Sequence, residues 1–197
     1  MVSSTSITLL NGLKDPRNET AWREFDARYR PIVIGFVRRL GIGEADAADV
    51  AQETLAQFAA EYTAGQSRRE RCRLRTWLVG IAKHRAADLL SRNARYAGRI
   101  QAVQPAAQST DDGIEELWLA EVRKMIRQTA LTELGEHTAL SSHTVRAFEL
   151  VALEERPVAG VARELGMSAD SVYKAKHRCL MHLRVILAEL NELYEID

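Results

Sequence analysis

Helical periodicity is the feature of this sequence that most limits what it can fold into. In almost every window apolar residues recur at spacings of three and four, whereas alternating β-branched runs and Asn-Gly hairpin turns are nearly absent. We therefore predict an all-α protein. Its expected helices cover residues 19–40, 44–62, 74–96, 114–134, 142–153 and 158–165, and a last helix follows Ser168.

The composition changes in residues 98–113, GRIQAVQPAAQSTDDG, which have little apolar periodicity. The stretch contains Pro, Gly, Gln, Ser and Thr, and this composition is typical of a flexible linker. We therefore expect two small helical domains, an N-terminal one at residues 5–97 and a C-terminal one at residues 114–190.

Charge is distributed unevenly, although the whole chain is formally neutral with 27 basic and 27 acidic residues. Residues 68–99 contain ten Lys and Arg side chains but only two acids, Glu70 and Asp88, so this segment carries +8 and the rest of the chain −8. Segregated charge of this kind indicates two surfaces that face different partners. A charged helix that only raises solubility is the simpler alternative.

Several features of the sequence bear on its cellular compartment. No apolar run approaches the roughly 18–20 residues of a transmembrane helix. The first residues, MVSST, lack the basic and apolar segments of a secretory signal. Cys72 and Cys179 lie far apart without CxxC spacing, which favours free thiols in a reducing compartment. We expect a cytoplasmic protein with no membrane insertion.

Residues 161–180, VARELGMSADSVYKAKHRCL, predict a helix-turn-helix, with a turn at Gly166 and a second helix that Ser168 can cap. The inward stripe of the second helix consists of Val172, Ala175, Cys179, Leu183, Ile186 and Leu190. The opposite side, near the helix start, carries Ser171, Lys174, His177 and Arg178. Such positions meet base edges and phosphates when a recognition helix enters the major groove. An αα-hairpin with a solvated face would share this pattern.

Motifs for catalysis and metal binding are missing from the sequence. It contains no G-x-S-x-G, no P-loop and no H-E-x-x-H. His137 and His143 lie six residues apart without a nearby Cys or carboxylate pair, which makes a poor metal site. We therefore expect no enzymatic activity, no cofactor and no metal.

Three segments resemble motifs of one protein family, and they stand in that family's order. DAADVAQETLAQF (Asp46–Phe58) and RLRTWLVGIAKHRAADLLSR (Arg73–Arg92) are similar to the polymerase-binding and promoter-melting helices of bacterial RNA polymerase sigma factors of the extracytoplasmic-function class. The helix-turn-helix resembles the fourth region of the same factors. The family usually carries Asn where this sequence has His84-Arg85, and its commoner recognition helix reads TVKSRLHRAR, so we carry over no base preference.

The resemblance implies a transcription initiation factor that is not an enzyme and that brings core RNA polymerase to promoter DNA. The first motif would bind the clamp helices of the largest polymerase subunit through Asp46, Asp49, Val50, Gln52, Glu53, Leu55 and Phe58. The basic segment would melt the minus-ten element through Arg68, Arg69, Arg73, Arg75, Trp77, Lys83, His84, Arg85, Arg92 and Arg95. The helix-turn-helix would read the minus-35 element through Ser168, Ser171, Lys174, Lys176, His177 and Arg178. An inhibitory anti-sigma protein is a further implied partner.

Some of these aromatic and acidic residues allow a second, purely structural interpretation. In the family, aromatic and polar side chains trap unstacked bases, and the candidates in this sequence are Tyr62, Trp77, His84 and Tyr96. Stacking of this kind contributes about 1–3 kcal/mol per base. On spacing alone, Trp77 is equally a core residue. The acidic residues Asp46, Asp49 and Glu53 would also suit an ordinary solvated helix face.

Other classes of protein fit the sequence less well. A dimeric helix-turn-helix regulator would need an N-terminal sensor domain, whose pocket should be apolar and concave rather than basic. An RNA-processing enzyme or RNA-binding module would need catalytic carboxylates or a stacking platform on a sheet, and we find neither in the sequence.

Overall fold

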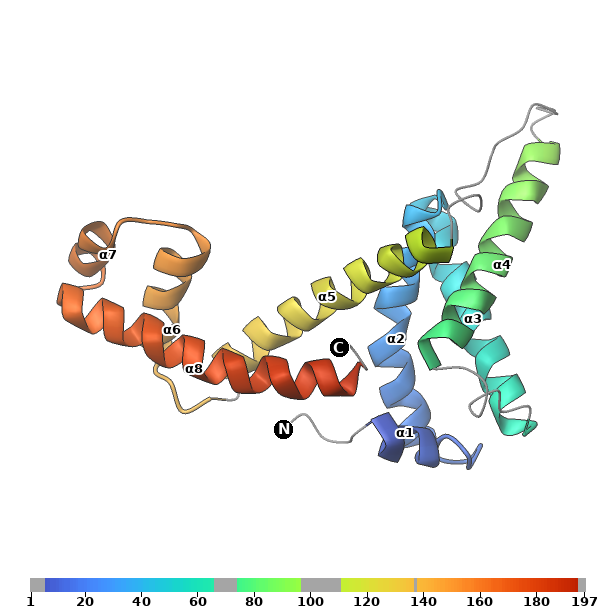
Figure 1. The fold of residues 1–197 in the computed structure, drawn as a ribbon, viewed down its shortest axis with the longest axis horizontal. Helices are drawn as coiled ribbons and strands as arrows, with labels where there is room; N and C mark the ends of the chain where they lie inside the picture. Colours follow the sequence, from blue (N-terminus) through green and yellow to red (C-terminus); the bar gives the residue numbers. More distant parts are fainter. Residues whose placement is uncertain (1–5, 66–73, 97–110, 137, 195–197) are drawn as a thin grey trace. The chain divides into compact units, whose positions relative to one another are not determined.

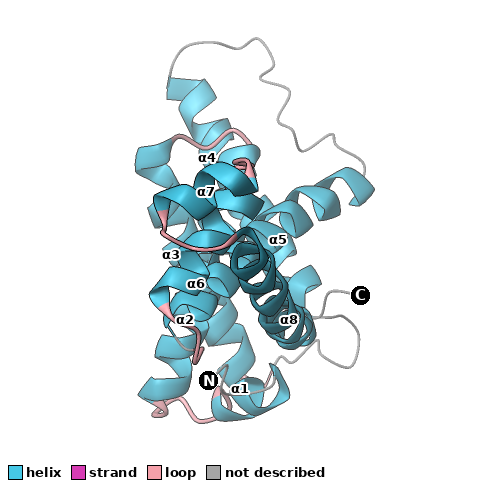
Figure 2. Ribbon diagram, turned by 90° about the vertical axis from the view of Figure 1, so that its left-hand side faces the viewer, coloured by secondary structure: helices cyan, strands magenta, loops and turns pink. Residues whose placement is uncertain are grey.

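The computed structural model describes residues 6–65, 74–96, 111–136 and 138–194 (Figure 1). Within these ranges the regular elements are α1 Ser6–Gly12, α2 Glu19–Arg39, α3 Glu44–Thr63, α4 Leu74–Tyr96, α5 Asp111–Glu136, α6 Ser142–Phe148, η3 Glu149–Leu153, α7 Val158–Glu164 and α8 Ala169–Leu193. Figure 2 shows helices joined by loops, and no strand occurs in the described ranges. The predicted all-α class is confirmed.

The chain divides into two compact units, and the division falls inside α5. One unit comprises residues 6–125, and the other contains residues 126–197. The predicted linker lies mainly on residues 97–110, outside the described residues, and its last residues form the start of α5. The expected domain boundaries therefore stay a prediction.

The first unit is built around aromatic rings shared by α2, α3 and α4. Phe25 of α2 stacks on Phe58 of α3 with ring centroids 4.8 Å apart, and Trp77 of α4 meets Phe58 edge-on at 5.0 Å. The Asn18 side chain caps α2 by accepting a hydrogen bond from a backbone N–H of its first turn. Gly41, at a φ of 98°, follows the end of α2 in a conformation that favours glycine. These rings and turns fix α3 and α4 against α2.

The inward faces of α3 and α4 consist of apolar side chains at the helical spacing seen in the sequence. On α3 the buried stripe contains Ala47, Val50, Ala51, Leu55 and Phe58. On α4 it contains Leu78, Ile81 and Ala82. Amphipathic periodicity therefore determined these faces, because apolar side chains three and four residues apart must share one side of a helix.

The second unit contains the helix-turn-helix, formed by α7, a turn and α8. Gly166 occupies the turn at a φ of 63°, and the Ser168 side chain accepts a hydrogen bond from the backbone N–H of Ser171 at 3.1 Å. Val161 of α7 and Val172 of α8 are both 0% exposed and share one core cluster. The predicted turn and cap are both confirmed.

The helix expected at residues 142–153 is not uniform. It is α-helical to Phe148 and then forms the π-helical η3, Glu149–Leu153. Glu155 follows at a φ of 54°, which is uncommon for a residue other than glycine. A π turn differs from an α turn in its hydrogen bonds, and a five-residue stretch is too short for apolar spacing to show this.

Candidate polymerase and nucleic-acid interfaces

The outer face of α3 carries the acidic residues of the first motif. Asp49, Gln52 and Glu53 are exposed, and Asp46 is half-buried in the first turn. The other three predicted polymerase-binding residues lie in the core, with Val50, Leu55 and Phe58 at 5%, 6% and 0% exposure. They therefore face the interior of the first unit, and a partner would meet the acidic face instead.

Glu53 and Arg85 link this acidic face to α4. The Nη1 atom of Arg85 lies 3.1 Å from Oε2 of Glu53, and its Nε donates to Oε1 of Gln57 at 3.0 Å. Asp49 has no ion pair within the described parts of the chain. Asp49 is therefore the acid on this face that is open to a new partner.

Two of the aromatic stacking candidates are core residues. Trp77 is 6% exposed, and its Nε1 donates to Oε2 of Glu61 at 2.7 Å. Tyr62 is 7% exposed, and its hydroxyl donates to the backbone oxygen of Leu10 at 2.8 Å. The core interpretation of Trp77 therefore fits the structure. The side chain of Tyr96 lies outside the described residues.

The predicted DNA-facing cations of α4 have different environments. His84, Arg92 and Arg95 are exposed, and Lys83 is half-buried. Arg75 is not free in solvent: its side chain is 23% exposed, and its Nη2 lies 2.5 Å from Oε1 of Glu115 on α5. Periodicity within α4 could not reveal this partner because it lies across the predicted linker. The remaining predicted cations, Arg68, Arg69 and Arg73, lie outside the described residues.

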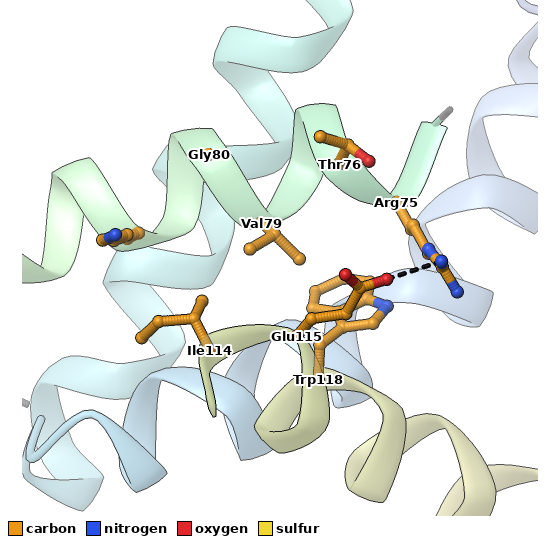
Figure 3. Close-up of a pocket in the computed structure, with 8 residues that line it drawn as sticks. Arg75, Thr76, Val79, Gly80, Ile114, Glu115 and Trp118 are labelled. Atoms are coloured by element: carbon orange, nitrogen blue, oxygen red, sulfur yellow. Dashed lines mark ion pairs between the residues drawn. The ribbon is translucent and has the colours of Figure 1, made fainter. Parts of the chain in front are cut away.

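A hollow of about 340 Å³ separates the start of α4 from the start of α5. Figure 3 shows Val79 of α4 and Ile114 and Trp118 of α5 around it, with the Arg75–Glu115 ion pair at one side. Both helix segments belong to the first unit. The hollow is mostly apolar with a basic margin, because Arg75 and Lys83 also line it.

Helix α8, the predicted recognition helix, presents its basic residues to solvent. Lys174, His177 and Arg178 are exposed, whereas Ser171 and Lys176 are half-buried. Nζ of Lys174 lies 2.7 Å from Oδ2 of Asp170, one turn earlier. The buried side of the same segment contains Val172, Ala175 and Cys179, as expected. The helix therefore has one polar face near its start.

Sequence reasoning did not include Tyr173 among the upstream-DNA residues. Its side chain is 60% exposed and lines a shallow surface hollow with Lys174, His177 and Arg178. The available signal was its spacing of four residues from His177, which places both on one helix face. This face therefore combines an aromatic ring with cations.

Three further features of the described residues concern metal sites, membrane-spanning helices and reactive thiols. They contain no group of His, Cys, Asp and Glu side chains that could hold a metal ion. Their helices include none long and apolar enough to span a membrane. Cys179 is a free, buried thiol, and burial raises its pKa above the ordinary value.

The core of α2, α3 and α4 corresponds to a known family region. Residues 25–96 match the family model described as Sigma-70 region 2. We call this part of the chain region 2 because of that similarity. In the family, region 2 binds core RNA polymerase and promoter DNA. No curated protein matches the chain.

The match bears on the broad role of the protein. The match supports a sigma-70 family factor. It also supports a role in transcription initiation with RNA polymerase, and factors of this family are not enzymes. The helix-turn-helix lies beyond the residues that match, so its assignment rests on its own geometry.

Proposed function

We propose that this protein is a promoter-specificity factor of the extracytoplasmic-function class. It binds core RNA polymerase, melts the downstream promoter element with region 2 and reads the upstream element with its helix-turn-helix. The observation that carries the proposal is the region 2 match over residues 25–96, which coincides with the packed core of α2, α3 and α4. The protein would act in the cytoplasm, where its polymerase partner works.

The proposed polymerase contact is the exposed acidic face of α3. The side chains of Asp49 and Gln52 are exposed, and Asp49 is unpaired within the described chain. The opposite side of α3 packs on α2 through the stacked rings of Phe58 and Phe25. A carboxylate on this face would meet basic groups of the clamp helices. Opposite charges across an interface speed encounter and set the register more than they add affinity.

The proposed melting surface lies on the solvent side of α4. His84, Arg92 and Arg95 are exposed along it, so they can reach phosphates or unstacked bases. The upstream contact is the polar face of α8, where Lys174, His177 and Arg178 lie near the helix start. Recognition helices use these positions in the major groove. An anti-sigma protein that masks such surfaces stays a prediction from the resemblance.

Reconstituted transcription tests the proposal. Purified core polymerase is incubated with a library of genomic fragments, with and without this protein, and the RNA 5′ ends are mapped. We expect discrete start sites that require the protein. Their absence at every fragment, together with failure of the protein to retain core polymerase in a pull-down, would contradict the proposal. A dimeric regulator would instead bind palindromic DNA alone and leave polymerase in the supernatant.

A further inference from the structure

The first half of α5, residues 114–125, packs against region 2 although it lies outside the family match. Trp118 is 1% exposed, and its ring lies edge-on to Phe36 of α2 with centroids 5.5 Å apart. Oε1 of Glu121 lies 2.5 Å from Nε of Arg39, and the Glu121 side chain is 7% exposed. Together with the Arg75–Glu115 pair, these contacts join α5 to both α2 and α4.

Gly35 of α2 leaves room for the buried side chain of Glu121. A Cβ atom built on Gly35 would overlap the carboxylate of Glu121. Glu121 is therefore buried against a stretch of α2 that has no side chain in its way. Burial of a carboxylate is costly unless a cation pairs with it, and Arg39 supplies that cation. The contact is thus specific in both shape and charge.

The contact with α4 is looser than the contact with α2. The hollow of about 340 Å³ lies between these segments, so the side chains around it lack packing partners on one side. Nε of Arg75 is buried and has no hydrogen-bond partner among the described residues. Segments with few buried contacts open at lower free energy than a packed core.

The ion pair at this contact involves Arg75, a cation that the sequence resemblance assigns to melting of the promoter. Arg75 offers its guanidinium to Glu115, and a carboxylate and a phosphate compete for the same donors. We propose that residues 114–125 of α5 are a displaceable acidic clasp on region 2, which single-stranded promoter DNA displaces. This regulation rests on the proposed function, because it acts on the same melting surface.

Loss of the Glu115 carboxylate tests the clasp. The binding of a fluorescein-labelled single-stranded oligonucleotide to the full chain is followed by fluorescence anisotropy between 50 and 200 mM salt, a range of about a factor of four. We expect Glu115→Gln to bind about two- to fivefold more tightly than the unmodified protein, the factor that corresponds to a partly exposed ion pair. The slope of log affinity against log salt should steepen by about 0.7, the value for one released single-strand counterion.

Glu116→Gln is the matched control. Its carboxylate is one residue away, is 63% exposed and pairs with Arg123 of the same helix at 2.8 Å. The two variants lose the same charge, but Glu115→Gln releases Arg75 of α4, whereas Glu116→Gln releases Arg123 of α5 itself. Equal oligonucleotide affinity for Glu115→Gln and Glu116→Gln, including no binding by either, would overturn the clasp.

Amide hydrogen exchange gives a second readout. Saturating oligonucleotide should accelerate exchange in residues 114–125 severalfold, while α2 and α3 stay protected. Unchanged exchange there at full occupancy would also overturn the clasp. The proposed function is judged separately, because reconstituted transcription by the unmodified protein does not depend on these variants.

Discussion

Arg85 of α4 holds Glu53 of α3 with its Nη1 atom 3.1 Å from Oε2, and so joins the two surfaces that the proposed function uses. One acid of the α3 face is therefore already paired with a cation of the same protein. Reversing the charge of Glu53 would therefore disturb α4 as well as any polymerase contact. A clean test of the polymerase face has to use another acid.

Asp49→Lys is that test. Asp49 is exposed and unpaired within the described chain, so its replacement should leave the fold intact. We expect affinity for core polymerase to fall about tenfold, which corresponds to about 1.4 kcal/mol. The measurement is a titration of labelled protein with core enzyme, with far-UV circular dichroism as the check on folding. Glu192→Lys, the same change on the far part of α8, is the control, and an equal loss for both variants would speak against the α3 face.

Trp77→Ala separates the core role of the ring from a role in base stacking. The side chain is 6% exposed and lies edge-on to Phe58, so its removal should destabilise region 2 by about 3–5 kcal/mol. Urea unfolding followed by circular dichroism measures this. Trp77→Phe should recover most of the stability but lose the hydrogen bond to Glu61. Normal stability of Trp77→Ala would contradict the core role.

Lys174 and Arg178 are expected to contact phosphates of the upstream element. Both are exposed and lie on the polar face of α8. Replacing both with Ala should weaken promoter binding by the polymerase complex and reduce the salt slope by about 0.9 for each phosphate that is no longer neutralised. Filter binding at several salt concentrations gives both numbers. Arg184→Ala removes an exposed cation farther along the same helix, and an equal effect there would refute a specific role for the first turns.

Tyr173 is expected to influence base preference in the upstream element. Its exposed ring can contact a thymine methyl group, and its hydroxyl can reach a base edge or phosphate. Tyr173→Ala should reduce discrimination at one or two base positions by about 1–3 kcal/mol each, without loss of stability. Selection of bound sequences from a randomised upstream element measures this. Tyr173→Phe keeps the ring and removes the hydroxyl, so it separates their contributions. An unchanged sequence profile for Tyr173→Ala would exclude Tyr173 from base readout.

Cys179 should make the second unit sensitive to alkaline pH. Burial raises the pKa of its thiol, so the folded state keeps the proton at a pH where the unfolded state has lost it. Stability is therefore full below the ordinary thiol pKa of 9.0 and falls as pH rises from there toward the folded value. Urea unfolding at pH 8, 9 and 10 should show a drop of up to about 1.4 kcal/mol per pH unit from this thiol. Cys179→Ala should remove that part of the slope, and an identical slope in both proteins would show that the thiol is not responsible.

Local patterns predicted much of the fold. Apolar spacing gave the buried faces of α3 and α8, and Gly166 with Ser168 gave the turn and cap before the recognition helix. These features depend on residues a few positions apart, so a single sequence contains the necessary information. The same reasoning missed η3, because its altered hydrogen bonds leave no distinct apolar spacing.

Contacts between distant residues could not be predicted in this way. Arg75 was predicted to face promoter DNA, but its partner in the protein, Glu115, lies forty positions later on α5. The pairing of Arg85 with Glu53 and the burial of Glu121 against Gly35 depend likewise on how helices cross. Candidate site residues were therefore found by type and spacing, but their availability to a partner required the structure.

Region 2 contains two glycines on neighbouring helices whose surroundings differ sharply. A methyl group on Gly80 of α4 would meet no atom within 4 Å, whereas one on Gly35 of α2 would strike the Glu121 carboxylate. A side chain at position 35 would therefore force the buried Glu121 carboxylate of α5 to move, whereas position 80 has room for one. One codon change at Gly35 could thus loosen the seating of α5 on α2, without altering any residue of the proposed polymerase and promoter contacts.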